Sequence, residues 1–153
     1  MITPGARRII LDFPLGIVAT IRPNRRPAAS PKGTFLVLGD TTIAYGNIRS
    51  LGTRRNLLKT PMAEVVFVDT FRRKGIRPSG NTEIVEGEFV RVNTLKTRWI
   101  DTWGGLAKRI RSLVLIHVDQ ASPLSTPPYD AGVTEDEMIE IYRGKYARMF
   151  PAP

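Results

Sequence analysis

The chain has 153 residues, 42% of them hydrophobic, and its 23 lysines and arginines against 14 acidic residues give a formal net charge of +9. This length and apolar content suit one hydrophobic core, so we expect a single domain over residues 1–153. The lack of cysteine excludes disulfides and thiolate metal sites, and no apolar run reaches the roughly 20 residues of a membrane-spanning helix. We therefore expect a soluble, cytoplasmic protein.

Arginine supplies 17 of the 23 basic side chains, and its planar guanidinium group pairs with phosphate through two hydrogen bonds. This composition favours an anionic partner, either nucleic acid or a phosphorylated cofactor. Nucleic acid needs a continuous basic face, whereas a cofactor phosphate needs only a local cluster. Because a solvated surface also accounts for most arginine pairs, the charge alone leaves both partners open. The basic clusters are Arg7-Arg8, Arg25-Arg26, Arg54-Arg55, Arg72-Arg73-Lys74, and Lys108-Arg109 with Arg111.

The first part of the chain predicts three strands. Residues 16–21 and 34–38 are rich in β-branched and aromatic residues and are bounded by proline and glycine, as strands often are. The short turn at residues 39–42 joins the second of these strands to a third at residues 43–46. This spacing predicts an antiparallel hairpin.

A short helix and another strand are expected next. Gly52 or Thr53 is the expected helix cap, and the helix continues to about Lys59 because Pro61 prevents its extension. The apolar, β-branched run at residues 63–69 then predicts a strand.

The middle of the chain alternates between hydrophobic and polar residues. After the basic turn at residues 70–75, this alternation over residues 76–92 predicts either a second hairpin or one long bent strand. Pro78 places the start of the segment at a sheet edge or a bulge. A second short helix is expected over about residues 101–110, with an interruption at Gly104-Gly105.

The last part of the chain predicts a strand, a loop and a helix. Residues 112–121 are a strand-like apolar run, and residues 122–132 form a proline-rich loop. Thr134 is expected to cap the final helix, with Glu137 completing a capping box. The apolar face of that helix is supplied by Met138, Ile141, Tyr142 and Tyr146.

About six short strands with few helices indicate a mainly β fold, a small antiparallel barrel with peripheral helices. A barrel of this size fills its interior with its own side chains. A ligand would therefore bind on the outside, at a rim or in a groove between two subunits.

Few side chains are candidates for catalysis. His117, the only histidine, lies within an apolar strand pattern, where we expect it to be packed or hydrogen-bonded in the core rather than to act as a base. Metal ligation needs more partners than this histidine has, and a Ser-His-Asp triad would also depend on it. The carboxylates at residues 135–137 stand at a helix start, where the helix dipole accounts for them. If the protein is an enzyme, a bound cofactor must supply the chemistry.

Several segments, taken in order, carry a resemblance to a known family. They are SPKGTFLVL at residues 30–38, IAYGNIRSLGTRRNL at 43–57, AEVVFVD at 63–69 and RRKGIRPSG at 72–80. Together they resemble the pyridoxamine 5'-phosphate oxidase family of FMN-binding split barrels, over roughly residues 10–90. The resemblance implies a split antiparallel β-barrel with FMN as its cofactor.

The resemblance also implies where FMN is held. The strand that matches residues 32–35 offers backbone groups to the flavin ring, and Lys32 or Ser30 reaches the phosphate. Arg54 and Arg55 would grip the phosphate at the start of the helix, where free N–H groups also attract an anion. The alternative is a capped helix with solvated arginines. The implied cofactor-binding residues are Ser30, Lys32, Gly33, Thr34, Tyr45, Gly46, Ser50, Thr53, Arg54 and Arg55.

Two departures from the family pattern bear on function. Gly75 stands where a true oxidase carries a glutamine, and the C-terminal motif that binds flavin and substrate phosphate in genuine oxidases is missing. We therefore expect a flavin-dependent oxidoreductase that acts on an unidentified small molecule other than pyridoxamine phosphate. The alternatives are an F420-dependent reductase of the same fold, a haem protein, for which one histidine is a poor fit, and a non-catalytic nucleic-acid-binding barrel.

The expected partner is a second copy of the chain. A barrel this small cannot enclose an isoalloxazine ring, so we expect a homodimer with FMN in two grooves at the subunit interface. Trp99, Trp103 and Tyr129 are candidates for lining the groove, although burial in the core or the interface is the more common fate of such rings.

Overall fold

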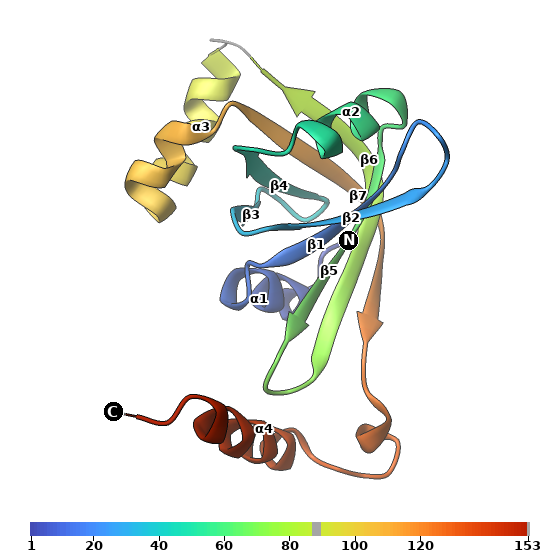
Figure 1. Ribbon diagram of the computed structural model, residues 1–153, viewed down its shortest axis with the longest axis vertical. Helices are drawn as coiled ribbons and strands as arrows, with labels where there is room; N and C mark the ends of the chain where they lie inside the picture. The colour runs from blue at the N-terminus through green and yellow to red at the C-terminus, as the bar shows by residue number, and fades with distance from the viewer. Residues whose placement is uncertain (87–89, 153) are drawn as a thin grey trace.

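Seven strands form one antiparallel sheet that curls into a half-barrel, in a computed structural model that describes residues 1–86 and 90–152 (Figure 1). The order of the strands across the sheet is β2-β1-β5-β6-β7-β4-β3. The split antiparallel barrel predicted from the sequence is confirmed. The strands are β1 (Gly16–Ile21), β2 (Pro27–Lys32), β3 (Phe35–Val37), β4 (Thr42–Asn47), β5 (Met62–Asp69), β6 (Lys74–Val85) and β7 (Ser112–Leu124).

Helices lie around this sheet rather than within it (Figure 1). Among the described residues, none of the helices is long and apolar enough to cross a membrane. They are α1 (Pro4–Asp12), α2 (Leu51–Lys59), α3 (Val90–Trp103) and α4 (Glu135–Met149), with short 3-10 helices η1 (Gly104–Arg109) and η2 (Pro127–Tyr129).

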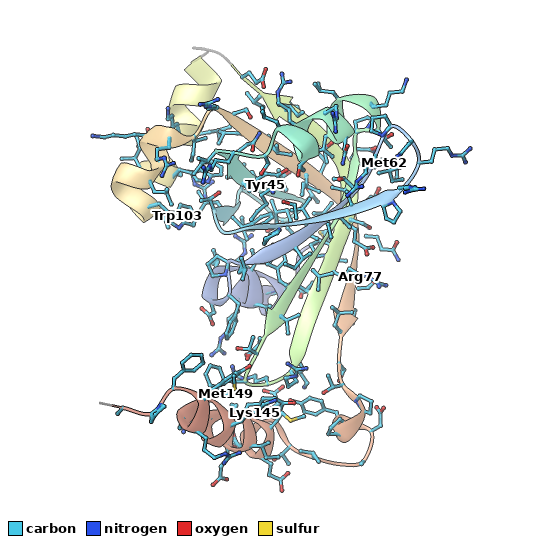
Figure 2. The ribbon with its side chains drawn as sticks, viewed as in Figure 1. Tyr45, Met62, Arg77, Trp103, Lys145 and Met149 are labelled. Carbon is cyan, nitrogen blue, oxygen red and sulfur yellow. The ribbon has the colours of Figure 1, made fainter. Side chains whose placement is uncertain are left out.

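The sheet has a hydrophobic cluster on each face, because successive side chains of a strand point to opposite sides. On the concave side, α1 packs Ile10 against a cluster that includes Phe35 and Tyr45 (Figure 2). On the other side, α3 and η1 cover the sheet, with the fully buried Trp99 at the centre of the cluster. The indole of Trp99 donates a hydrogen bond to the backbone oxygen of Thr34 at 2.8 Å.

Several local predictions are confirmed. β3 and β4 form the expected hairpin, in which Phe35 pairs with Tyr45. Thr134 and Glu137 form the expected capping box, because the hydroxyl of Thr134 accepts from the N–H of Glu137 and the carboxylate of Glu137 accepts from the N–H of Thr134. The interruption at Gly104 is also confirmed, since its φ of +51° ends α3 and η1 follows.

β6 is one long strand rather than a second hairpin, and its register shifts between Ser79 and Gly80. A Cβ on Gly80 would lie 1.9 Å from the backbone oxygen of His117, so the close approach of the two strands requires glycine there. The prediction that Pro78 stands at a bulge is confirmed by its place beside this shift.

Two predicted boundaries are wrong. The caps expected at Gly52 and Thr53 lie inside α2, which begins at Leu51 after Ser50, because the side-chain oxygen of Asn47 accepts the N–H of Ser50 and turns the chain into the helix earlier. The alternating pattern up to residue 92 does not remain strand, since β6 ends at Val85 and α3 already begins at Val90.

Two elements were not predicted from the sequence. Helix α1 begins after Thr3, whose hydroxyl accepts the N–H of Ala6 as an N-cap. Strand β2 contains Pro27 and Pro31, which argue against a strand, but β2 lies at one end of the sheet order, where proline is tolerated. β2 and β3 are separate strands, so residues 32–35 do not form one continuous strand.

Candidate functional site

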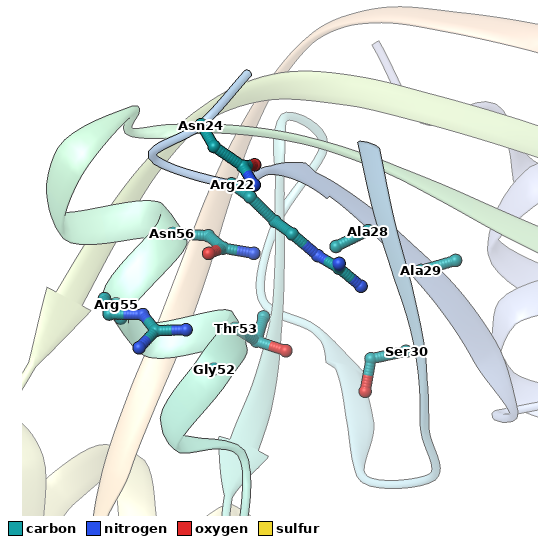
Figure 3. A pocket seen from close by; sticks show the side chains of 9 residues that line it. All are labelled: Arg22, Asn24, Ala28, Ala29, Ser30, Gly52, Thr53, Arg55 and Asn56. Carbon is teal, nitrogen blue, oxygen red and sulfur yellow. The ribbon is translucent and has the colours of Figure 1, made fainter. Parts of the chain in front are cut away.

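A cavity of about 430 Å³ lies between the β1–β2 hairpin and the first turns of α2 (Figure 3). Its wall contains two arginines, two hydroxyl groups and two asparagines, and it contains no carboxylate. Such a set attracts anions, because guanidinium groups and hydroxyls donate hydrogen bonds and no negative charge competes for them. The lining residues are Arg22, Asn24, Ala28, Ala29, Ser30, Gly52, Thr53, Arg55 and Asn56.

The two arginines reach the cavity from different elements. Figure 3 shows the side chain of Arg22, which follows β1, extending across the space between α2 and β2, whereas that of Arg55 lies along α2 at the cavity wall. Neither forms an ion pair with a described residue. Two like charges that share one cavity repel each other, so an anion between them would be bound favourably.

Helix α2 adds to the positive potential at the cavity. Its first intrahelical hydrogen bond runs from the N–H of Arg54 to the oxygen of Ser50, so the N–H groups of residues 51–53 precede the helical ladder. Gly52 and Thr53, from this first turn, line the cavity. The positive end of the helix dipole therefore lies at the same place as the two arginines.

Asn56 brings a buried acceptor to the cavity wall. Its side-chain nitrogen donates to the hydroxyl of Thr20 at 3.0 Å, and its residue is only 3% exposed. Its side-chain oxygen is buried and accepts no hydrogen bond from the described residues. A buried acceptor without a donor is costly, so Asn56 lowers the stability of this part of the fold.

Lys32 is the third cation near the cavity. It lies on the same face of β2 as Ser30, and its ammonium group donates to the Ser30 hydroxyl and, at 3.4 Å, to the oxygen of Pro31. The residue is 7% exposed and pairs with no described carboxylate. Burial lowers the pKa of the Lys32 amine, because the charged form loses its hydration.

Ser30, Thr53 and Arg55, all predicted to bind the cofactor, come together in this cavity, and Lys32 reaches it through Ser30. Arg54, by contrast, forms a bidentate ion pair with Glu86, with N–O distances of 2.6 and 2.9 Å. Hydrogen bonds from Arg54 hold the pKa of Glu86 below its usual range. Neighbours on a helix point about 100° apart, so only one of two adjacent arginines faces the cavity.

The other predicted residues take positions away from the cavity. Tyr45 is 1% exposed, with its ring 5.2 Å from that of Phe35, and burial raises the pKa of its hydroxyl well above the usual value. The Thr34 hydroxyl donates to the oxygen of Gly46 at 2.9 Å and accepts from its N–H at 3.1 Å. Ser50 precedes α2 as its N-cap.

Glycine at position 46 has a packing role. A Cβ there would lie 2.3 Å from the terminal carbon of Ile110, which packs over β4 from the end of η1. Gly33 lines a different cavity, next to Leu15 and Ile17.

The sequence reasoning missed Arg22, Asn24 and Asn56 as residues of this site. Arg22 and Asn24 lie in the turn between β1 and β2, and only the pairing of Ile21 with Pro27 brings that turn beside α2. If β2 had been recognised as the partner of β1, the sequence would have predicted that Arg22 and Asn24 lie near α2.

The expectation of a core position for His117 is wrong. Its side chain is about half exposed on the outer face of β7, where it lies 3.2 Å from Glu83. It faces outward because buried Ile116 and Val118 occupy the alternate positions of the strand. Among the described residues, no cluster of three potential metal ligands exists.

The three aromatic candidates lie away from the cavity. Trp99 is fully buried and Trp103 packs beside it on the outer cluster. Tyr129 donates its hydroxyl to the oxygen of Arg72 at 2.5 Å, beside the β5–β6 turn.

Three solved structures illustrate what this fold resembles. HupZ from Group A Streptococcus is 28% identical, with a TM-score of 0.71 over 82% of this chain and 96% of that chain. An FMN-binding protein from Syntrophomonas wolfei is 20% identical, with a TM-score of 0.65 over 79% of this chain and 84% of that chain. HutZ, the heme storage protein from Vibrio cholerae, is 15% identical, with a TM-score of 0.66 over 80% of this chain and 93% of that chain.

Sequence comparison identifies the family directly. Among curated proteins, none matches the chain. Residues 2–125, however, match the family described as Pyridoxamine 5'-phosphate oxidase, and this range spans the whole sheet and the cavity beside α2. The chain therefore belongs to the pyridoxamine 5'-phosphate oxidase family.

Proposed function

We propose that the protein is an FMN-binding flavoprotein that oxidises or reduces a small molecule other than pyridoxamine phosphate. The observation that carries this proposal is the cavity between β2 and α2, which has two arginines, two hydroxyls and a helix start but no carboxylate. The family match and the FMN-binding protein of the same fold support the choice of FMN.

The residues present fit a phosphorylated ligand. Arg22 and Arg55 would bind the phosphate from two sides, and the hydroxyls of Ser30 and Thr53 would complete its hydrogen bonds. The volume of about 430 Å³ lies within the range of small-molecule sites, and part of the ligand would extend beyond it.

In this proposal the cofactor performs the redox chemistry, and the protein binds and positions the cofactor. Bound FMN supplies the transfer of hydride or single electrons, which no side chain of the chain can perform. The chain binds the phosphate through Arg22 and Arg55 and keeps the local potential positive. A positive potential stabilises the negative charge that a reduced flavin carries.

Haem suits this cavity less well than FMN. Proteins bind haem iron through histidine, cysteine, methionine or tyrosine, and none of these lines the cavity. The only histidine, His117, lies on the outer face of β7 beside Glu83. The family resemblance also allows the deazaflavin F420 as the cofactor. The experiment below distinguishes F420 from FMN.

We further propose that the protein is a homodimer with its cofactor at the interface. The outer face of β1 and β5 exposes large apolar side chains: Ile17 is 40% exposed, Ile21 45%, Met62 56% and Val68 37%. β1 and β5 are neighbours in the sheet, so these side chains form one surface. An exposed apolar patch of this kind is typical of a protein interface.

Purified protein tests the cofactor. We expect it to be yellow, to release FMN on denaturation, and to melt at a higher temperature with added FMN than with riboflavin, which lacks the phosphate. Stabilisation by F420 but not by FMN would establish the alternative. Colourless protein that responds to neither and binds DNA in a salt-dependent manner would overturn the flavin proposal.

Light scattering tests the dimer. We expect wild type to have the mass of two chains and the double variant Ile17→Lys, Met62→Lys to have the mass of one, because charges cannot be buried unpaired in an apolar interface. Leu58→Lys is the matched control, since Leu58 is 60% exposed on α2. A wild-type monomer that retains FMN would place the cofactor within one chain and contradict the interface.

A further inference from the structure

Helix α4 has one face that packs on the protein and one that is exposed to solvent among the described residues. Met138 is buried, and Tyr146 packs against Phe71 of the β5–β6 turn with ring centroids 5.4 Å apart. Figure 1 shows α4 at one end of the molecule, beyond the β5–β6 turn and away from the other helices. The opposite face borders a groove of about 490 Å³, lined by Val133, Glu137, Glu140, Ile141, Gly144 and Arg148.

Gly144 in the middle of α4 has no explanation within one chain. A Cβ at this position would meet only the end of the flexible Arg148 side chain, at 3.7 Å, so no packing in the chain requires glycine. Glycine is among the least favourable residues in a helix interior. A small residue on an exposed helix face allows another backbone to approach closely.

The charges on this face are arranged in a self-complementary way. Glu137 and Glu140 lie in the first half of α4, Arg148 lies near its end, and Ile141 lies between them with 57% exposure. Glu140 and Arg148 form no ion pair with any described residue. If two such helices run antiparallel about a two-fold axis near residue 142, the acidic half of each meets the basic end of the other.

We propose that α4 is a contact between two copies of this chain, paired antiparallel through this face. Ile141 of one copy packs over Gly144 of the second, and Arg148 of each lies between Glu137 and Glu140 of the other. Opposite charges at both ends and a small residue at the centre fix the register and the antiparallel direction.

This contact is distinct from the apolar face of β1 and β5. Helix α4 begins at Glu135, beyond the residues that match the family, and its contact would be an addition to the family's shared fold. A single pair of helices buries too little surface to hold two monomers together alone. The pairing would therefore strengthen or extend an assembly, and the test has to detect proximity rather than mass.

Cysteine trapping detects that proximity, because the chain contains no cysteine. Under mild oxidation, we expect Ile141→Cys to form disulfide-linked dimers at least about tenfold faster than Arg143→Cys, because pairing raises the effective concentration of the thiols. Arg143 is equally solvent-exposed but lies on the other side of α4. Equal rates for the two variants would overturn the proposal.

Charge reversal supplies a second criterion. In the Ile141→Cys background, Arg148→Glu should slow cross-linking to the rate of the Arg143→Cys control, because the new carboxylate would face Glu137 and Glu140 of the second copy. Adding Glu140→Arg should recover part of the rate, because it replaces one of these two repulsions with an attraction. Circular dichroism should be unchanged, since these side chains are exposed. Failure of Glu140→Arg to raise the rate of the Arg148→Glu variant would exclude the proposed pairing, whatever cofactor the protein binds.

Discussion

The cations beside α2 and those at the β5–β6 turn differ in whether they have carboxylate partners. In the α2 cavity, Arg22, Arg55 and the nearby Lys32 have no carboxylate partner among the described residues. At the β5–β6 turn, Arg72 pairs with Asp69 at 2.8 Å and with Glu135 at 3.4 Å. Lys74 pairs with the same Glu135 at 2.6 Å and lies 4.4 Å from the ring of Tyr129.

This difference separates cations that support the fold from cations available to a ligand. The carboxylate of Asp69 is buried and accepts from the N–H groups of Phe71 and Arg72, so it organises the turn on which α4 rests. Burial alone would raise the pKa of Asp69, but the hydrogen bonds from Arg72 and Phe71 lower it below its ordinary value. Unpaired cations crowded at one cavity do nothing for the fold, and such sites are commonly functional.

Removing both cavity arginines should have the largest effect. A charge-assisted hydrogen bond contributes about 1.5–3 kcal/mol, so the double variant Arg22→Ala, Arg55→Ala should bind FMN at least about a hundredfold more weakly. The unfolding free energy of the free protein should scarcely change, because neither side chain forms an ion pair with a residue that the structure describes. Isothermal titration with FMN measures this effect.

Riboflavin provides the control for that variant, because it keeps the flavin ring and lacks the phosphate. We expect its affinity to change little. An equal loss of FMN and riboflavin would show that the arginines support the site without binding the phosphate.

Asp69→Ala should have the largest effect on the other region. It leaves two backbone N–H groups without an acceptor and removes one of the two carboxylate partners of Arg72, which should lower the unfolding free energy by about 2–3 kcal/mol in urea denaturation. Asp119→Ala, an exposed control, should cost less than about 0.5 kcal/mol. FMN affinity should stay the same, and its loss would show that the two regions are coupled.

The pKa of Asp69 predicts the pH dependence of that contribution. Because its pKa is lowered on folding, the stabilisation is fully present above the unfolded-state pKa of about 3.9 and is lost as pH falls through the folded-state value. Asp69→Ala should therefore differ from wild type at pH 7 and converge with it in acid.

Lys32→Met should have a smaller effect than Asp69→Ala. It should make the free protein more stable and FMN binding weaker. Replacing a buried, unpaired ammonium group with an apolar side chain of similar length should stabilise the free protein by about 1 kcal/mol at pH 7. The variant should also bind FMN more weakly, since one positive charge is lost. A variant that is less stable than wild type would mean that Lys32 is well satisfied by Ser30 and Pro31 alone.

The lowered pKa of Lys32 sharpens that test. Its folded state binds fewer protons than the unfolded chain, so wild-type stability should rise with pH from the folded-state pKa up to the unfolded value of about 10.4. Lys32→Met should lack this rise. If the stability of wild type and of Lys32→Met depends on pH in the same way, Lys32 is not the source of this rise.

Arg54→Ala should have the smallest effect on the ligand. Its guanidinium is engaged by Glu86, so FMN affinity should change by less than about threefold, in contrast to Arg55→Ala. A loss as large as that of Arg55→Ala would mean that Arg54 leaves Glu86 when the cofactor binds.

Features that depend on neighbours along the chain could be predicted from the sequence. Runs of β-branched and apolar residues predicted β1 and β5, a short turn predicted the β3–β4 hairpin, and Thr134 with Glu137 predicted the cap of α4. The family motifs likewise predicted a phosphate-binding segment at the start of α2. Each of these signals is contained within a few consecutive residues, so no tertiary information is needed to recognise it.

Features that depend on distant partners could be seen only in the folded protein. Whether Arg54 or Arg55 faces the cavity depends on Glu86, which is 32 residues away from Arg54, and Arg22 joins the site only because β2 pairs with β1. β2 itself exists despite two prolines because it lies at the end of the sheet. These outcomes follow from packing and pairing between segments far apart in sequence, where local propensity is outweighed by burial and by hydrogen bonds across the sheet.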